Sequence, residues 1–387
     1  MYKQIAALRG LNFTYYATTV ILQTFLPLYF VTKGYTSSQV GILMMIGPFI
    51  AMFAQPVWGY VSDWMQSVKW IILTLWSLTI VSSFFLFSVS GFTLTFVFVL
   101  LLFFFMLPSI PLLDSMAIQS IEGTNQSYAS IRMFGSLGFC IVAVLVGLLV
   151  PLVGGVEHID KLYWIFWIFP IPILIFGLRD VKSEGPRISV NAIGILLRNR
   201  LFLWYLLMVF ILMIPHRAND VLFGLYIHQN GAPNWLLSAS WAIAALSELP
   251  GFMLANRLLR RYHELALLGI VGFLYAIRWV LYAIITNPWA LFALQSLNLL
   301  TFSLFWIIAI HYTTRLVPEQ LRSTGQSILS AVFLGLAGIA GGYVGGTLLD
   351  HWGGFGLYGM GAIISSLAAI MFIGTHAYLR RTGSMNA

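Results

Sequence analysis

Apolar runs of about 20 residues recur along the whole chain, and this pattern limits the possible folds more than any other feature. Short clusters of Gly, Pro, Asn and charged residues separate the runs. A helix needs about 20 apolar residues to cross the hydrocarbon core of a bilayer. We predict twelve such helices, at residues 8–32, 38–62, 69–90, 93–119, 128–152, 162–178, 201–228, 235–259, 265–285, 288–314, 323–348 and 355–379.

The composition excludes a soluble globular domain. Of the 387 residues 60% are hydrophobic and only 8% are charged, whereas soluble domains have about 25% charged residues. The chain therefore belongs to the class of all-α polytopic membrane proteins. MYKQIAALRG leads into the first apolar run without a small-residue cleavage site, so we predict an uncleaved first helix. The single cysteine, Cys140, rules out an intrachain disulfide.

The basic residues orient the chain in the membrane. The formal net charge is +8, and with a cytoplasmic N-terminus only Lys33 and Lys161 fall on the outer side. This distribution follows the positive-inside rule and predicts two cytoplasmic termini in a cytoplasmic membrane of bacterial type. The positive charge then requires no nucleic acid partner. Fifteen basic residues fall on the cytoplasmic side: Lys3, Arg9, Lys69, Arg179, Lys182, Arg187, Arg198, Arg200, Arg257, Arg260, Arg261, Arg315, Arg322, Arg380 and Arg381.

The longest polar connection, RDVKSEGPRISVNAIGILLRNR at 179–200, divides the chain into two halves of six predicted helices. We expect one bundle at 1–178 and a second at 201–387, joined by a cytoplasmic linker. Duplicated transporter halves retain weak internal similarity. Three correspondences appear at offsets of 190 to 197 residues: Leu28-Tyr29 and Gly34 with Leu225-Tyr226 and Gly231, Asp63 with Asn256, and Arg132 and Gly135 with Arg322 and Gly325.

With these halves the chain resembles the major facilitator superfamily over essentially its whole length. The superfamily's loop signature Gly-x-x-x-Asp-Arg-x-Gly-Arg-Arg is matched by Gly59 and Asp63 in the first half and by Asn256-Arg257 with the following arginines in the second. The resemblance implies a monomeric transporter of twelve helices in two pseudo-symmetric halves. It also implies that Gly59, Asp63, Asn256 and Arg257 serve loop geometry and gating.

A closer resemblance is to the lactose-permease-like and 3-phenylpropionate-permease-like proton symporters. It rests on PLLDSMA (111–117), SYASIRMFGSLG (127–138), His216 with LYI (225–227), LSELP (246–250) and AIRW (276–279). The resemblance implies coupled movement of protons and a small organic solute, in the class of aromatic acids, sugars or nucleosides.

Ionisable residues inside apolar segments are costly, so by default they face a cavity or a partner. Asp114 and Arg132 lie at similar depth on the fourth and fifth predicted helices. Glu248 and Arg278 differ in depth by about one helical turn, which a long arginine side chain can span. We interpret these residues as charge pairs that line a substrate cavity; the alternative is that they only fix helix packing.

The seventh predicted helix carries the polar run PHRAND, with His216, Arg217, Asn219 and Asp220. His216 and Asp220 share a helix face, and Arg217 can reach Asp220. Glu248 is the first candidate for the proton-coupling residue and Asp220 the second, because the proton affinity of a carboxylate depends on its burial and its charged neighbours. The alternative is that Asp220 only neutralises Arg217.

Uncharged residues complete the predicted substrate cavity. Asn12, Gln23 and Asn298 are expected to supply directed hydrogen bonds, and Trp241 an aromatic wall near Glu248. Tyr16, Gln119, Gln295 and Gln326 belong to the same group of polar residues in apolar segments. His311 lies near the cytoplasmic boundary and reads as an interfacial histidine.

The sequence contains no P-loop, metal-ligand cluster or G-x-S-x-G nucleophile elbow. We therefore expect no cofactor and no enzymatic activity, and transport driven by an ion gradient with alternating access of the two halves. Proton-coupled symport is the leading hypothesis. A proton-driven multidrug efflux antiporter is the main alternative, which the direction of flux would distinguish. A polytopic membrane enzyme and a receptor without transport activity are further alternatives.

Overall fold

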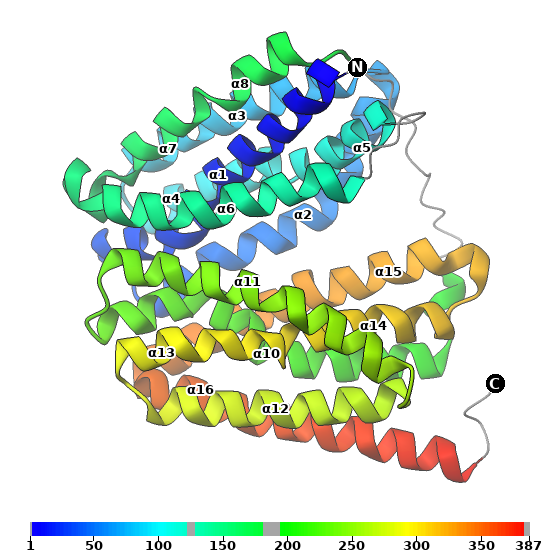
Figure 1. Ribbon diagram of the computed structural model, residues 1–387. Helices are drawn as coiled ribbons and strands as arrows, with labels where there is room; N and C mark the ends of the chain where they lie inside the picture. The colour runs from blue at the N-terminus through cyan, green and yellow to red at the C-terminus, as the bar shows by residue number, and fades with distance from the viewer. Residues whose placement is uncertain (1, 122–127, 181–193, 383–387) are drawn as a thin grey trace. The chain divides into compact units, whose positions relative to one another are not determined.

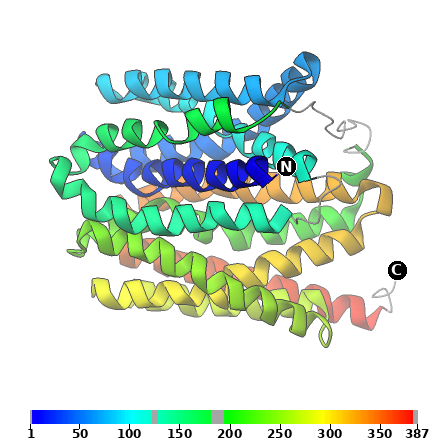
Figure 2. The same cartoon turned by 45° about the horizontal axis from the view of Figure 1, so that its top comes forward.

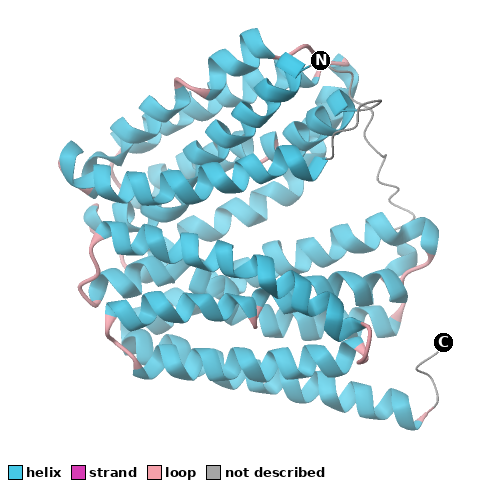
Figure 3. Ribbon diagram, in the orientation of Figure 1, coloured by secondary structure: helices cyan, strands magenta, loops and turns pink. Residues whose placement is uncertain are grey.

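All the regular structure in the described residues is helical. The computed structural model describes residues 2–121, 128–180 and 194–382, and these contain no strand (Figure 3). The predicted all-α class is therefore confirmed. Most of the predicted linker at 179–200, including Lys182 and Arg187, lies outside the described residues.

The contacts between residues divide the chain into two compact units. The division into bundles at 1–178 and 201–387 stays a prediction. Within each unit the helices lie side by side along a common direction (Figure 1 and Figure 2). The units comprise Met1–Pro186 with Ala232–Ala242, and Arg187–Gly231 with Ile243–Ala387.

In the first unit the long α1 packs against α6, and α3 packs against α4 (Figure 1). Side chains at the ends set the limits of several helices: Thr36 and Gln39 form a capping box that begins α2, and Ser67 caps α3. The helices of this unit are α1 (Tyr2–Thr32), α2 (Ser37–Met65), α3 (Val68–Ser88), α4 (Phe92–Met106), α5 (Ser109–Ile121), α6 (Tyr128–Leu149), η1 (Val150–Val153), η2 (Val156–His158), α7 (Ile159–Trp167), α8 (Pro170–Pro172) and η3 (Ile173–Gly177).

In the second unit α16 packs against both α10 and α12. The first residues of α11 are assigned to the first unit. The helices are α10 (Arg200–Gln229), α11 (Asn234–Leu259), α12 (Glu264–Ile284), α13 (Pro288–Leu294), η4 (Gln295–Leu299), α14 (Phe302–Leu316), η5 (Glu319–Leu321), α15 (Arg322–Ser330), η6 (Ala331–Leu336) and α16 (Ala337–Arg381).

Ten helical stretches of the described residues are long and apolar enough to cross a membrane. The last of them, Thr324–Arg381, has 58 residues and contains Gly353, whose φ of 62° and ψ of −161° are not helical. It therefore covers both the eleventh and the twelfth predicted segments. The more polar α1, with Asn12, Gln23 and several threonines, corresponds to the first predicted segment and is not among the ten.

Four predicted segments depart in their interior from the one continuous α-helix that was expected, the eleventh of them at the π-helical η6 (Ala331–Leu336). Leu107 and Pro108 separate α4 from α5 within the fourth segment, because proline cannot donate a helical hydrogen bond. Pro170 and Pro172 divide the sixth segment into α7, a short turn and the π-helical η3. The tenth segment changes to a 3-10 stretch at Gln295–Leu299.

The repeat that the sequence indicates has a matched turn in each unit. Gly34 after α1 has a φ of 85°, and Gly231 after α10 has a φ of 86°. Residues with a side chain rarely adopt this left-handed conformation. Glycine at both positions therefore ends the first helix of each repeat in the same way.

Glycines on α16 allow its close approach to α10. A Cβ on Gly341 would lie 2.6 Å from the carbonyl oxygen of Ile214 and 2.7 Å from the amide nitrogen of Ala218. Small residues at such contacts let helix backbones pack closely in membranes, where lipid tails are as apolar as leucine.

Candidate functional site

The tenth apolar segment is interrupted in its middle, and a buried arginine lies beside the interruption. After α13 ends at Leu294, a 3-10 stretch and an irregular turn lead to Thr301 before α14 begins. Non-helical backbone at membrane depth is tolerated only where protein or a water-filled cavity surrounds it. Arg278 on α12 contacts this stretch and is only 1% exposed. An interrupted helix beside a buried charge is typical of transporter binding sites.

Uncharged oxygen atoms hold the guanidinium of Arg278. It donates hydrogen bonds to Thr301 Oγ1 at 2.8 Å, Gln295 Oε1 at 2.9 Å, Asn298 Oδ1 at 3.0 Å and the Tyr282 hydroxyl at 3.4 Å. Among the residues that the structure describes, no carboxylate lies within ion-pair distance of it. Each hydrogen bond to a charged group contributes about 1.5–3 kcal/mol, so these acceptors together offset much of the cost of burying the charge.

Glu248 reaches Arg278 through the side chain of Asn298. The Asn298 amide nitrogen donates to Glu248 Oε1 at 2.9 Å, while its oxygen accepts from Arg278. The prediction of a direct pair between Glu248 and Arg278 is therefore wrong, because the interruption places an amide between the two charges. We call Arg278, Asn298 and Glu248 the charge relay.

The sequence contains a signal for this arrangement. Gln295, Asn298 and Thr301 are spaced three residues apart. A 3-10 helix has three residues per turn, so this spacing places the three side chains in one row. Thr301 was not among the predicted residues, and Gln295 was expected only as a general polar group.

Three side chains of α10 form a second polar cluster with a tyrosine of α12. Arg217 Nη1 lies 2.6 Å from Asp220 Oδ2, and His216 Nε2 lies 3.7 Å from the same oxygen. His216 Nδ1 and the Tyr275 hydroxyl are 3.3 Å apart and share a hydrogen bond. The proximity that the helical spacing predicts for these residues is therefore present. We call His216, Arg217, Asp220 and Tyr275 the His216 cluster.

Aromatic rings cover one side of the His216 cluster. The imidazole of His216 stacks on Phe302 with a centroid distance of 4.9 Å and an interplanar angle of 7°. Phe333 lies 5.5 Å from the guanidinium carbon of Arg217. Phe333 belongs to the π-helical turn η6, and such turns are frequent at functional sites. Ring faces beside a few directed polar groups suit a small ring-shaped solute.

Tyr275 connects the two groups of residues. It precedes Arg278 by three positions on α12, and its hydroxyl contacts both Thr301 beside the relay and His216 of the cluster. The charge relay and the His216 cluster are therefore neighbours in one unit, and together they contain two arginines and two carboxylates.

Two predicted cavity residues have other surroundings. Asn219 is 2% exposed, and its Oδ1 accepts a hydrogen bond from the Tyr358 hydroxyl at 3.1 Å, which ties α10 to α16. Trp241 is partly exposed and lies two turns before Glu248 in α11. A substrate contact for either residue stays a prediction.

The first unit contains a smaller polar group beside the interruption of the fourth segment. The hydroxyl of Tyr128 hydrogen-bonds Asp114. The guanidinium carbon of Arg132 lies 4.0 Å from the ring centroid of Tyr16, a cation–π contact. Asp114 and Arg132 interact electrostatically but are not within ion-pair distance in the described part of the chain. Asp114 and Arg132 therefore do not form the expected close pair: Asp114 contacts Tyr128, and Arg132 contacts Tyr16.

The two predicted polar residues of α1 differ in exposure. Asn12 is 2% exposed, and its amide donates to the carbonyl oxygen of Leu8 at 3.0 Å. Gln23 is exposed. Neither residue has a recorded hydrogen bond to Asp114 or Arg132, and a contact with substrate stays a prediction for both.

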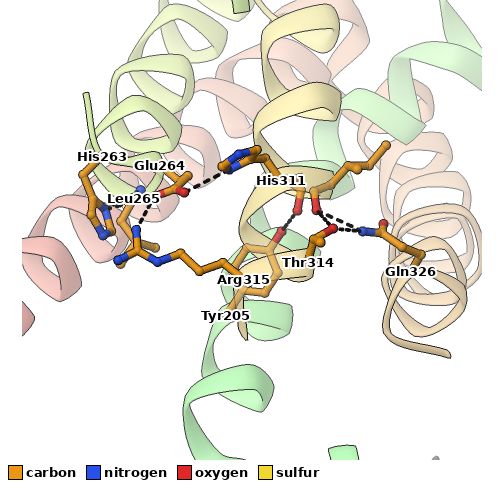
Figure 4. Close-up of polar contacts among 10 residues, drawn as sticks. Tyr205, His263, Glu264, Leu265, His311, Thr314, Arg315 and Gln326 are labelled. Carbon is orange, nitrogen blue, oxygen red and sulfur yellow. Dashed lines mark hydrogen bonds and ion pairs between the residues drawn. The ribbon is translucent and has the colours of Figure 1, made fainter. Parts of the chain in front are cut away.

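A third polar cluster lies where α12 begins and α14 ends (Figure 4). Glu264 is buried, and its two carboxylate oxygens contact His311 Nδ1 at 3.0 Å and Arg315 Nη1 at 3.1 Å. His263 caps α12 through a hydrogen bond from the Leu265 amide to its Nδ1 at 3.2 Å. Glu264 was not predicted as a site residue, because a carboxylate at a predicted turn is expected to be exposed to water.

The predicted gating residues lie within helices and not in loops. Gly59 and Asp63 belong to the last two turns of α2, and Asn256 and Arg257 to the last turn of α11. Asp63, Asn256 and Arg257 are exposed. The helix α2 continues to Met65, past its predicted end at residue 62, whereas α11 ends at Leu259 as predicted.

Hydrogen bonds that the sequence did not predict join the start of α3 to the end of the sixth segment. The carboxylate of Asp180 accepts hydrogen bonds from Ser67 Oγ and from the backbone amide of Lys69. In return, Lys69 Nζ donates to the carbonyl oxygens of Ile175 and Leu178 at 2.7 and 2.8 Å. Each charge thus satisfies backbone groups left free at the end of the other helix.

Membrane-crossing helices, interrupted segments and a buried charge relay together define a polytopic membrane transporter. The sequence profile described as the MFS_1 like family matches residues 5–360. The chain belongs to this family of the major facilitator superfamily, which confirms the resemblance in the sequence.

Known proteins similar to the chain are transporters. It is 26% identical to the uncharacterized transporter YwbF of Bacillus subtilis (strain 168), over 94% of this chain and 91% of the relative. It is 29% identical to a maltose permease of Geobacillus stearothermophilus, over 82% of this chain and 80% of the permease. The crystal structure of the nucleoside transporter NupG has a TM-score of 0.83 at 18% identity, covering 96% of this chain and 98% of that one. This last likeness shows the fold.

Proposed function

We propose that the chain is a proton-coupled symporter that takes up a small neutral solute of the sugar or nucleoside class. The observation that carries the proposal is the charge relay at the interruption of the tenth segment. Alternating access of two pseudo-symmetric halves would expose this site to each side of the membrane in turn. The proposal includes a location in a bacterial cytoplasmic membrane with two cytoplasmic termini, as the distribution of basic residues predicts. It also includes a monomer, as the resemblance to the major facilitator superfamily implies.

Glu248 is the preferred site of protonation in this proposal. Asp220 already has Arg217 at 2.6 Å, so protonation of Asp220 would break an ion pair. The recorded hydrogen bond of Glu248 comes from the uncharged Asn298 amide, which a protonated carboxyl group can still accept. Proton uptake at Glu248 therefore disturbs fewer favourable contacts, and Arg278 senses the change through the relay.

The side chains around the site favour a neutral solute over an aromatic acid. Arg278 is buried, and uncharged acceptors hold both of its terminal nitrogens, while Nη1 of Arg217 is paired with Asp220. A carboxylate that bound both terminal nitrogens of either guanidinium would displace existing bonds. Asparagine, glutamine, histidine and tyrosine groups beside ring faces suit hydroxyl groups and planar rings. A maltose permease among the relatives and a nucleoside transporter with the same fold support these two solute classes.

The test is accumulation of maltose and of nucleosides by the full chain in proteoliposomes with an imposed pH gradient. One proton per neutral solute allows tenfold accumulation for each pH unit, since a tenfold ratio corresponds to about 1.4 kcal/mol. Glu248→Gln keeps an acceptor for Asn298 but cannot release a proton. We expect this variant to exchange solute across the membrane without accumulating it.

Glu319→Gln is the matched control, because Glu319 is an exposed carboxylate paired with Arg322 at 3.3 Å. This variant should accumulate solute as the unmodified protein does. Gradient-driven accumulation by Glu248→Gln at the level of the control would exclude Glu248 as the coupling residue. Proton-driven export from the vesicles, with no uptake in the opposite gradient, would favour the efflux antiporter.

A further inference from the structure

A groove separates the first turns of α10 from the last turns of α16. Its volume is about 550 Å³, and it lies in the second unit at the end where both helices carry arginines. Arg200 and Trp204 line it from α10, and Gly374, Thr375 and Tyr378 line it from α16. A Cβ placed on Gly374 would meet no atom within 4 Å, so this glycine leaves the groove open.

The groove has a wide apolar part and a polar rim. Leucine and methionine side chains form much of its lining. The indole of Trp204 donates to Thr375 Oγ1 at 2.9 Å, which fixes one aromatic ring at the groove. Trp204 and Tyr378 are 42% and 66% exposed, and exposed Trp and Tyr residues are typical of the level of the lipid headgroups. The groove therefore faces the boundary between acyl chains and headgroups.

Arg200 lines the groove itself, and two further arginines lie at the same end of the unit, in the last turn of α16. Arg200, Arg380 and Arg381 are exposed, and within the described ranges none of them has an ion pair with a carboxylate. A second cavity of about 430 Å³ is lined by Arg380 and Arg381 together with His376. Basic pockets between transmembrane helices on the cytoplasmic side are suited to anionic lipid headgroups.

We propose that this groove is a binding site for one anionic phospholipid. An acyl chain occupies the apolar part beside Gly374, and Arg200 binds the phosphate. The arginines at this end of α10 and α16 select an anionic lipid, because a zwitterionic headgroup would bring a cation toward them. The site is independent of the proposed solute and of the charge relay.

The test compares the binding of dioleoylphosphatidylglycerol and dioleoylphosphatidylcholine to the purified full chain by native mass spectrometry. A Cβ at Gly374 meets no atom within 4 Å, so Gly374→Leu can place a side chain in the groove. We expect its affinity for phosphatidylglycerol to fall at least tenfold. Gly359→Leu on the same helix is the matched control, since a Cβ there also meets no atom within 4 Å and Gly359 does not line the groove.

A second pair of variants separates charge from shape. Arg200 is exposed, and Arg200→Gln should lower the preference for phosphatidylglycerol about fivefold, which corresponds to about 1 kcal/mol for a basic residue near the membrane surface. Arg257→Gln removes the same charge from the last turn of α11 and should leave the preference unchanged.

Three results would overturn the proposal. The first is that the unmodified protein binds the two lipids equally. The second is that Gly374→Leu binds phosphatidylglycerol as well as Gly359→Leu does. The third is that glycerol phosphate at the same concentration displaces the lipid completely, because the groove would then be a phosphate site without a role for the acyl chain.

Discussion

Replacement of Asn298 by leucine tests the charge relay directly. Asn298 makes two hydrogen bonds to charged groups, one with Arg278 at 3.0 Å and one with Glu248 at 2.9 Å. Leucine has a similar volume but neither donates nor accepts. Each lost bond to a charged group costs about 1.5–3 kcal/mol, so Asn298→Leu should lower the free energy of unfolding by about 3–6 kcal/mol.

Asn12→Leu is the matched control for this measurement. Asn12 is also a buried asparagine, but its amide donates to the uncharged carbonyl group of Leu8. Loss of a neutral hydrogen bond costs about 0.5–1.5 kcal/mol. The unfolding free energies can be compared by titrating each variant with sodium dodecyl sulfate in mixed micelles and following helix content by circular dichroism.

The reasoning would be refuted if Asn298→Leu lost no more stability than Asn12→Leu. The charges of Arg278 and Glu248 would then be compensated without the amide between them. Glu248→Gln provides an internal check, because it retains an acceptor for Asn298 and should cost less than Asn298→Leu.

Two further predictions concern helix ends and helix contacts. Burial lowers the pKa of His263 below its ordinary value of 6.5, so the unfolded chain binds more protons near that pH and stability should fall as the pH drops below about 6.5. His263→Asn keeps a cap for α12 without titrating, and the unfolding midpoint should then depend less on pH; an unchanged pH dependence would contradict this. Gly341→Ala should destabilise the protein by about 1–3 kcal/mol because its Cβ meets the backbone of α10. Gly359→Ala should be neutral or stabilising, and equal unfolding midpoints for the two alanine variants would refute the packing argument.

The sequence was sufficient for the helical class and the approximate helix positions. A run of about 20 apolar residues has few alternatives to a membrane helix, because unpaired backbone groups are costly in lipid. The repeat was also visible, since Gly34 and Gly231 are glycines for the same conformational reason. The helical spacing of His216 and Asp220 correctly placed both side chains on one face.

Helix interruptions were harder to predict, because they depend on what surrounds them. The sequence of the tenth segment is apolar enough for one continuous helix. Its 3-10 stretch is stabilised by Arg278, which comes from another helix and is 17 to 23 residues away from its partners along the chain. The same holds for Glu264, whose burial follows from His311 and Arg315 on α14.

The sequence by itself determined which charges enter the membrane and at what approximate depth, because hydrophobic length and helical rise are local properties. Only the tertiary structure decided their partners. Depth along two helices does not fix the rotation of either helix about its axis, and a third side chain can lie between two charges that match in depth. Asn298 does so between Glu248 and Arg278, and it turns an expected ion pair into a relay.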